Sequence, residues 1–236
     1  MALALIGGAS AITRGVAVSR VLARTPVDEL SAQDTANMQT LAGLARSDAG
    51  SRWYQEAEAV TRAGAARYNA VPITTLLHIV PGAVFLFVAP LQLVPRFRTR
   101  RPGVHRRLGY VLLGLAVPYA LTGIFFSLHK PVFGPLAAAA SGLAGTWFVY
   151  STVRAYAAIR RRDIDRHREW MLRAMAAAYG IAAVRLVFLA MVIVVPFNPI
   201  AMGATSFWAG WLVAALPMEW WIRQTRRERQ TLRWAS

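Results

Sequence analysis

Four histidines are the residues of this chain best suited to bind a metal or a cofactor, and there is no cysteine. Two imidazoles on facing helices can hold one b-type haem, so four match the number that two haems need. A single haem on His78 and one further ligand is an alternative, and interfacial or hydrogen-bonded histidines without a metal are another. The residues open to a haem-iron role are His78, His129, His105 and His167.

Arg185 lies within the apolar run GIAAVRLVFLA. A guanidinium near the centre of a bilayer costs about 3 kcal/mol on insertion scales, so it needs a polar neighbour. No Asp or Glu falls in the middle of an apolar segment of the sequence, and a buried salt bridge is therefore not expected. Backbone carbonyls, a water-filled cavity or a ligand with anionic or carbonyl oxygens remain, and so does simple packing through a hydrogen bond to a neighbouring helix.

Two apolar segments begin with similar basic motifs, Val104-His105-Arg106-Arg107 and Asp165-Arg166-His167-Arg168. Cations are disfavoured at a helix N-terminus because the exposed N–H groups already make that end positive. An anion bound between the two helix starts would compensate, whether a lipid headgroup, a soluble anion or a cofactor carboxylate. The alternative is that membrane topology alone places these arginines, while Asp163, Asp165 and Glu169 neutralise the second start.

The composition indicates that these residues are held in a membrane. Apolar residues make up 56% of the chain and charged residues 16%, values outside the usual range of a soluble domain. The net charge of +16 comes from arginines at the ends of apolar segments, which is the positive-inside pattern. We therefore expect no nucleic-acid partner, and neither a Walker phosphate loop nor an HExxH zinc motif occurs in the sequence.

Five apolar segments are near the length that spans a bilayer, and they predict an all-α, polytopic transmembrane helix bundle. They cover about residues 73–94, 107–128, 135–157, 170–195 and 204–222. Arginine clusters follow the first, third and fifth, so these ends and the C-terminus are expected in the cytoplasm. Before the 73–222 bundle we expect an N-terminal anchor or interfacial helix over 1–24 and a polar extracytoplasmic segment with short helices over 25–72, and after it a basic cytoplasmic tail over 223–236.

Within these spans, small residues and prolines carry further expectations. Ser141 and Gly145 lie one turn apart and permit close approach of a neighbouring helix, which favours a central place for the third span. Prolines inside spans are tolerated where neighbouring groups satisfy the freed backbone, and kinks are expected there. These prolines are Pro81, Pro90, Pro118 and Pro217.

A set of motifs in fixed order resembles a known family. They are His78-Ile-Val-Pro-Gly82, Pro90-Leu-Gln-Leu-Val-Pro-Arg96-Phe-Arg98, His105-Arg-Arg-Leu-Gly109, His167-Arg-Glu-Trp-Met-Leu-Arg173 and Arg185. Over about residues 73–190 this set is similar to the bacterial integral membrane proteins called domain of unknown function 2306. The resemblance implies a polytopic membrane protein with an outer segment before the first matched helix, and implies no reaction. We expect this protein in the bacterial inner membrane. Its motif positions are His78, Gln92, His105, Arg106, His167, Arg168, Trp170, Met171, Arg173 and Arg185. Where many members have Gly-Arg, this chain has Gly109-Tyr110, which removes one cation from any anion site there.

Together these observations predict binding of an anionic or cofactor-like small molecule between the first, second and fourth spans, through His78, His105, His167 and Arg185. The full set of candidate ligand-binding residues is His78, Gln92, His105, Arg106, His167, Arg168, Arg173 and Arg185. One alternative is a b-type haem or quinone-linked electron-transfer protein, an oxidoreductase if the chain is an enzyme at all. Another is a non-catalytic subunit or scaffold of a membrane complex or homo-oligomer. Membrane lipids, including an anionic lipid, and quinone are the expected partners.

Overall fold

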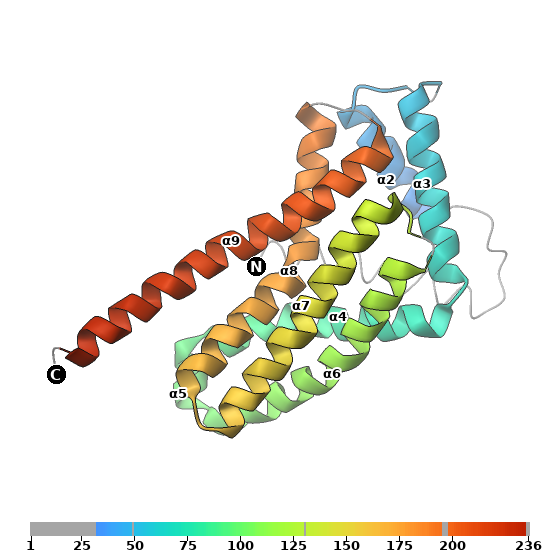
Figure 1. The fold of residues 1–236 in the computed structure, drawn as a ribbon. Helices are drawn as coiled ribbons and strands as arrows, with labels where there is room; N and C mark the ends of the chain where they lie inside the picture. Colours follow the sequence, from blue (N-terminus) through green and yellow to red (C-terminus); the bar gives the residue numbers. More distant parts are fainter. Residues whose placement is uncertain (1–31, 49, 130, 195–197, 235–236) are drawn as a thin grey trace.

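The computed structural model describes residues 32–48, 50–129, 131–194 and 198–234, and in these residues it contains helices and no strands (Figure 1). The predicted all-α fold is confirmed. The helices are α2 (Ala32–Leu44), α3 (Arg52–Asn69), α4 (Pro72–Leu93), α5 (Pro95–Arg100), α6 (Pro102–Leu128), α7 (Gly134–Arg160), α8 (Ile164–Val194) and α9 (Pro199–Trp234). The expected anchor over 1–24 lies outside the described residues.

Five of these helices, α4, α6, α7, α8 and α9, are long and apolar enough to cross a membrane. Each covers one predicted span, but α6, α8 and α9 begin five or six residues earlier, at Pro102, Ile164 and Pro199. The starts of α6 and α8 lie earlier because each helix continues into an arginine-rich flank, where arginine is itself a good helix former, and α9 begins at Pro199 behind the Asn198 cap. The last helix likewise continues through the predicted basic tail as far as Trp234.

Prolines mark several helix starts as well as helix interiors. Pro95 and Pro102 stand in the first turns of α5 and α6, where the missing N–H has no intrahelical partner to lose. The four prolines named from the sequence lie inside helices, Pro81 and Pro90 in α4, Pro118 in α6 and Pro217 in α9.

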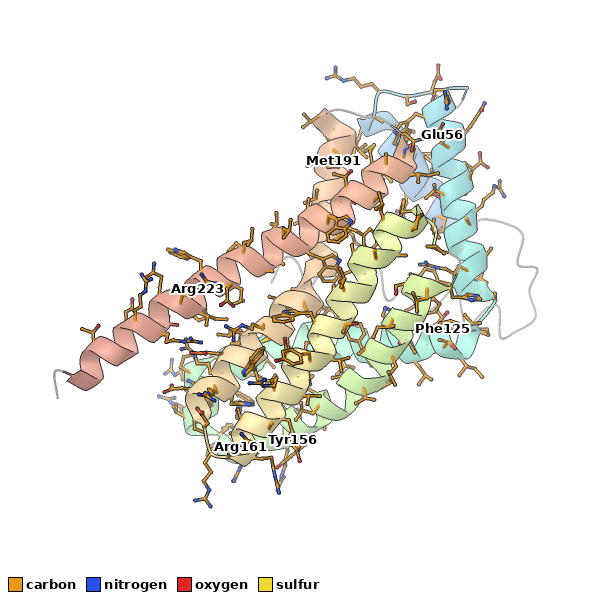
Figure 2. The ribbon with its side chains drawn as sticks, viewed as in Figure 1. Glu56, Phe125, Tyr156, Arg161, Met191 and Arg223 are labelled. Carbon is orange, nitrogen blue, oxygen red and sulfur yellow. The ribbon has the colours of Figure 1, made fainter. Side chains whose placement is uncertain are left out.

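The bundle has two chemically different ends. At one end α5, the starts of α6 and α8 and the end of α7 bring together a large group of arginines, and we call this the arginine end. At the other, the α3 end, α2 and α3 pack beside the end of α8 and the start of α9. Arg161 and Glu56 mark the two ends in Figure 2. The last turns of α9 project beyond the other helices (Figure 1).

Helix α7 packs against α6, α8 and α9, in agreement with the central place expected for the third span. A Cβ at Gly145 would lie 2.9 Å from Cγ1 of Ile124 in α6. This distance is too short for a side chain, so the glycine allows α6 and α7 to approach closely.

The closest helix contact joins α8 to α9. A Cβ at Gly210 would lie 2.4 Å from the backbone nitrogen of Val184, and one at Gly180 would lie 1.8 Å from the ring of Trp211. The buried face of α8 is otherwise formed largely by alanines. Small residues on both helices therefore fix the position of Trp211 and of the α8 side chains around it.

Asn198 links this part of the bundle to α3. Its Oδ1 accepts hydrogen bonds from the N–H groups of Ile200 and Ala201, both at 3.0 Å, and so caps the start of α9. Its Nδ2 donates to Glu56 of α3 at 2.7 Å. The cap thus holds α3 against the helix that it covers.

Candidate functional site

A cavity of about 640 Å³ lies beneath α3, between α6, α7, α8 and α9, and we call it the α3 cavity. Most of its wall is apolar or aromatic. The polar and charged side chains in the wall are Thr61, Arg67, Tyr68, His78, Tyr119, Ser127, Ser141, Arg185 and Ser206. Arg185 and His78, which are assigned to one binding site from the sequence, therefore line the same space.

His78 is held in place by the neighbouring helix α6. Its Nδ1 lies 3.2 Å from the carbonyl oxygen of Tyr119 and 3.1 Å from Oγ1 of Thr122. A carbonyl only accepts, and the Thr122 hydroxyl donates to the carbonyl of Pro118. Both contacts are thus satisfied when Nδ1 carries the proton, which assigns the lone pair of the ring to Nε2.

Two glycines make room for this arrangement. The His78 ring stacks on Tyr119 with centroids 5.0 Å apart and meets Phe126 edge-on at 5.7 Å. A Cβ at Gly82 would lie 2.7 Å from the Tyr119 ring, and one at Gly123 would lie 3.2 Å from Cε1 of His78. Side chains at these two positions would therefore push the stacked rings away from the cavity wall.

Arg67, in the last turn of α3, brings a second guanidinium to the cavity. Its Nη1 donates to the carbonyl of Phe126 at 3.2 Å and its Nη2 to the hydroxyl of Tyr68 at 3.0 Å. The guanidinium also lies over both rings, 4.8 Å from the Tyr68 centroid and 5.6 Å from that of Phe126. Its Nε is buried without a partner in the described part of the chain.

The wall of the α3 cavity is positively charged on an apolar background. The charges of Arg67 and Arg185 both reach the His78 ring. Among the lining residues that the structure describes, none is Asp or Glu. Such a wall suits a ligand with an apolar body and one or more anionic or carbonyl oxygens.

The arginine end brings His105 and His167 together. These two histidines and Arg98 lie close enough to interact electrostatically. His167 makes a 2.9 Å hydrogen bond through Nδ1 to the carbonyl of Ala155, whereas Nδ1 of His105 is buried with no partner among the residues described. The two similar basic motifs do therefore meet, and an anion between them stays a prediction.

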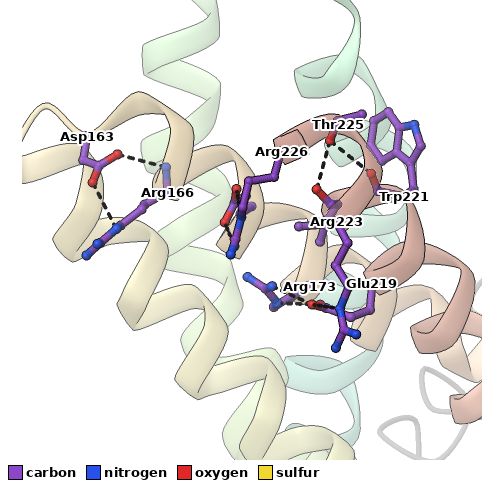
Figure 3. Close-up of polar contacts among 10 residues, drawn as sticks. Asp163, Arg166, Arg173, Glu219, Trp221, Arg223, Thr225 and Arg226 are labelled. Atoms are coloured by element: carbon purple, nitrogen blue, oxygen red, sulfur yellow. Dashed lines mark hydrogen bonds and ion pairs between the residues drawn. The ribbon is translucent and has the colours of Figure 1, made fainter. Parts of the chain in front are cut away.

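The other candidates at this end have varied surroundings. Nε2 of Gln92 is buried without a partner in the described residues, and Arg106 is exposed. Arg168 lies over the ring of Trp221, 5.0 Å from its centroid. Arg173 donates from Nε and Nη2 to Glu219 of α9, at 2.9 and 3.0 Å (Figure 3).

The structure thus places the predicted residues in two clusters rather than one. His167 and Arg185 share α8 but are separated by about 27 Å at 1.5 Å per residue. His78 and Arg185 line the α3 cavity, while His105 and His167 lie at the arginine end. His129 stacks on Phe125 at 5.0 Å and is not part of the cavity wall, so His78 is the one histidine there in the described chain.

A second cavity of about 890 Å³ opens between α7, α8 and α9 toward the arginine end, and we call it the basic groove. Its charged lining residues are Arg154, Arg166, Glu169, Arg173, Glu219 and Arg226, and its tryptophans are Trp147, Trp170, Trp208 and Trp211. Glu169 is buried and accepts two hydrogen bonds from Arg226 of α9. It therefore joins two helices, whereas Asp163 caps α8 by accepting from the N–H of Arg166 at 3.0 Å.

Sequence reasoning missed Arg67, Tyr119 and the two ion pairs between α8 and α9. Arg67 precedes the first span in a segment that the sequence marks only as polar. Its role depends on a contact with α6, far along the chain, and no local pattern reports such a contact. The acids offered a partial signal, because Glu219 lies near the inner end of an apolar segment that otherwise has none.

The comparisons with known proteins agree with the architecture. A family model described as "Predicted membrane protein (DUF2306)" matches residues 75–222. No curated protein and no solved structure matches the chain. The matched region includes the five membrane-spanning helices up to the Glu219 pair, and most of the residues that line the α3 cavity. The chain therefore belongs to the DUF2306 family of predicted membrane proteins.

Proposed function

We propose that this protein binds a small amphiphile in the α3 cavity, with the anionic or carbonyl oxygens of the ligand near Arg185. One observation carries the proposal: His78 of α4 and Arg185 of α8 line one cavity together with Arg67. These three side chains come from three helices that only the fold brings together. An otherwise apolar wall leaves room for the body of the ligand.

The chemistry of each group supports this assignment. The guanidinium of Arg185 offers a planar set of donors that matches a carboxylate or a pair of carbonyl oxygens. Nε2 of His78, with its lone pair, can accept a hydrogen bond from a hydroxyl or a protonated acid on the ligand. The aromatic wall, including Tyr119, Phe126 and Trp211, suits a chain or a ring, as in most small-molecule sites.

Thermal unfolding in detergent with two probes of equal chain length tests the proposal. We expect dodecanoate to raise the Tm of wild-type protein, because ligand binding stabilises the folded state, and dodecyltrimethylammonium to leave it unchanged. Arg185→Gln should abolish the dodecanoate effect, while Arg100→Gln, an exposed control in α5, should keep it. Equal stabilisation by both probes, or no dependence on Arg185, would overturn the proposal. Mass spectrometry of molecules retained on purification would identify the natural ligand.

Haem coordination by His78 is a second candidate, favoured by one specific observation. Metal-binding histidines usually donate their other ring N–H to a carbonyl, as Nδ1 of His78 does toward Tyr119. Nε2 of His78 would then hold the iron, and any further iron ligand from the described cavity wall would have to be a side chain other than histidine. A Soret band that disappears in His78→Ala would select this function. Colourless protein purified from haem-replete cells would eliminate it.

We further propose that the protein lies in the bacterial inner membrane with the arginine end and the C-terminus in the cytoplasm. The distribution of arginines supports this orientation. Because the chain has no cysteine, single-cysteine variants can report it. A membrane-impermeant maleimide added to intact spheroplasts should label Ser47→Cys and spare Arg161→Cys. The reverse pattern would contradict the orientation.

A further inference from the structure

The basic groove has the charge, shape and depth of a lipid site that is separate from the α3 cavity. We propose that it binds an anionic phospholipid, with the headgroup at Arg154 and Arg166 and one acyl chain along the apolar wall between α7 and α9. This site goes beyond the proposed function, because its charged residues are not those of the α3 cavity and its ligand is one that the membrane itself supplies.

The charge of the groove supports an anionic headgroup. Four arginines and two glutamates line it. The glutamates are already engaged by two of the arginines, since Arg173 pairs with Glu219 and Arg226 with Glu169. Of the other two, Arg166 has a 3.4 Å contact with Asp163 outside the groove wall, so the excess positive charge in the groove falls mainly on Arg154.

Arg154 is the better placed of these two to meet a headgroup. Its guanidinium donates to the hydroxyl of Tyr150 at 3.0 Å and lies 5.0 Å from the ring centroid of Trp170. Arg173 lies over the same Trp170 ring at 4.7 Å. The aromatic contacts hold the Arg154 guanidinium in the groove while leaving donors for phosphate oxygens. Arg166 is 70% exposed and has a 3.4 Å contact with Asp163 (Figure 3).

The apolar part of the groove extends from these arginines toward the membrane interior. Its wall is formed by large side chains that are exposed in the isolated chain, namely Leu143, Trp147, Trp208, Leu212 and Leu216. Trp211, Ala144 and Ala177 line both the groove and the α3 cavity. An acyl chain would therefore run along the wall and end at Trp211, where the α3 cavity begins.

The depth of the arginines favours a phospholipid over a soluble anion. Arg154 lies six residues before the end of α7 at Arg160, which is about 9 Å inside that end at 1.5 Å per residue. A headgroup with an acyl chain reaches this position from the bilayer, whereas a free anion would have to leave water. Basic pockets between transmembrane helices on the cytoplasmic side are known to bind anionic headgroups.

Native mass spectrometry in detergent, with phosphatidylglycerol and phosphatidylcholine of identical acyl chains, tests this site. We expect wild-type protein to retain phosphatidylglycerol preferentially. Arg154→Gln should lower that preference about fivefold, the effect of roughly one basic contact. Arg160→Gln removes a charge one and a half turns away but outside the groove wall, and it should leave the preference unchanged. Arg185→Gln, which disables the α3 cavity, should also leave it unchanged, so the two proposals fail independently.

Several results would overturn the lipid site. The first is equal retention of the two lipids, and the second is an undiminished preference in Arg154→Gln. The third is displacement of phosphatidylglycerol by millimolar inorganic phosphate. The fourth is a dimer that retains no lipid, because a second copy of the chain would then cover the groove. If Arg154→Gln does not fold, Arg166→Gln replaces it, because that side chain is largely exposed and its loss should leave the bundle intact. It should lower the preference in the same direction.

Discussion

The α3 cavity and the basic groove both place guanidinium groups inside a membrane-spanning bundle, but the two regions treat them differently. In the basic groove, Arg173 and Arg226 each form an ion pair with a carboxylate on a neighbouring helix. In the cavity, the described wall carries Arg67 and Arg185 beside a histidine and includes no acid. The two ion pairs of the basic groove join α8 to α9, whereas the polar groups of the α3 cavity line an open space. Under our proposal, charge inside this bundle serves assembly in one place and recognition in the other.

The largest expected effect comes from a substitution that disrupts the α3 cavity and the basic groove together. Gly210→Leu places a side chain where even a Cβ would lie 2.4 Å from the backbone nitrogen of Val184, so α8 and α9 must separate. We expect loss of folded protein, or a decrease of about 3 kcal/mol in the free energy of unfolding, measured by size exclusion and thermal unfolding in detergent. Gly114→Leu is the control, because nothing lies within 4 Å of a Cβ there. Equal yields of folded protein and equal stabilities in the two variants would contradict the close packing of α8 against α9.

A smaller effect distinguishes the ion pair between α8 and α9 from an ion pair on the surface of α3. Glu219→Gln removes the carboxylate that faces Arg173, whose side chain is 12% exposed. We expect the free energy of unfolding to fall by about 2 kcal/mol, as for other hydrogen bonds to buried charged groups. Glu58→Gln removes an exposed pair with Arg62 on α3 and should cost between about 0 and 1 kcal/mol. Similar losses in denaturant titrations of both variants would mean that the α8–α9 pair has no special role in assembly.

The smallest expected effect tests the hydrogen bonds that orient His78 in the α3 cavity. Thr122→Val removes one of the two acceptors of the His78 N–H while keeping the shape of the side chain. With one hydrogen bond of about 1 kcal/mol lost, we expect dodecanoate to bind up to about fivefold more weakly while the Tm of the free protein changes little. Thr146→Val, on the exposed face of α7, is the matched control and should bind as wild type does. A large Tm loss with unchanged binding would assign Thr122 to packing instead.

The sequence was sufficient to predict the five spans, because length and apolarity alone decide whether a helix crosses a bilayer. It was also sufficient to predict that His78 and Arg185 are unusual, since a polar residue is costly in either place. It predicted that the two belong to one site, but it could not predict which other residues share their cavity, because this depends on how α3, α4, α6 and α8 pack. The expectation of one site that also includes His105 and His167 illustrates that limit, because the structure places these two histidines together at the arginine end, with His167 about 27 Å from Arg185 along α8.

The ion pairs between α8 and α9 also could not be predicted from local sequence. The sequence suggests that Glu169 neutralises the start of its own helix, and the structure pairs it with Arg226 of α9. Local charge patterns report neighbours one turn away, such as Asp163 and Arg166. They do not report a partner on another helix.

The account depends most on the role of Arg185 in recognition, and the dissociation constant of dodecanoate tests it most directly. It should be measured for wild-type protein and Arg185→Gln at one fixed detergent concentration. We predict binding at least about tenfold weaker in the variant, the effect of losing one charge-assisted contact, with the oligomeric state and the helix content unchanged. Equal dissociation constants for the two proteins would contradict the assignment of the α3 cavity as a ligand site.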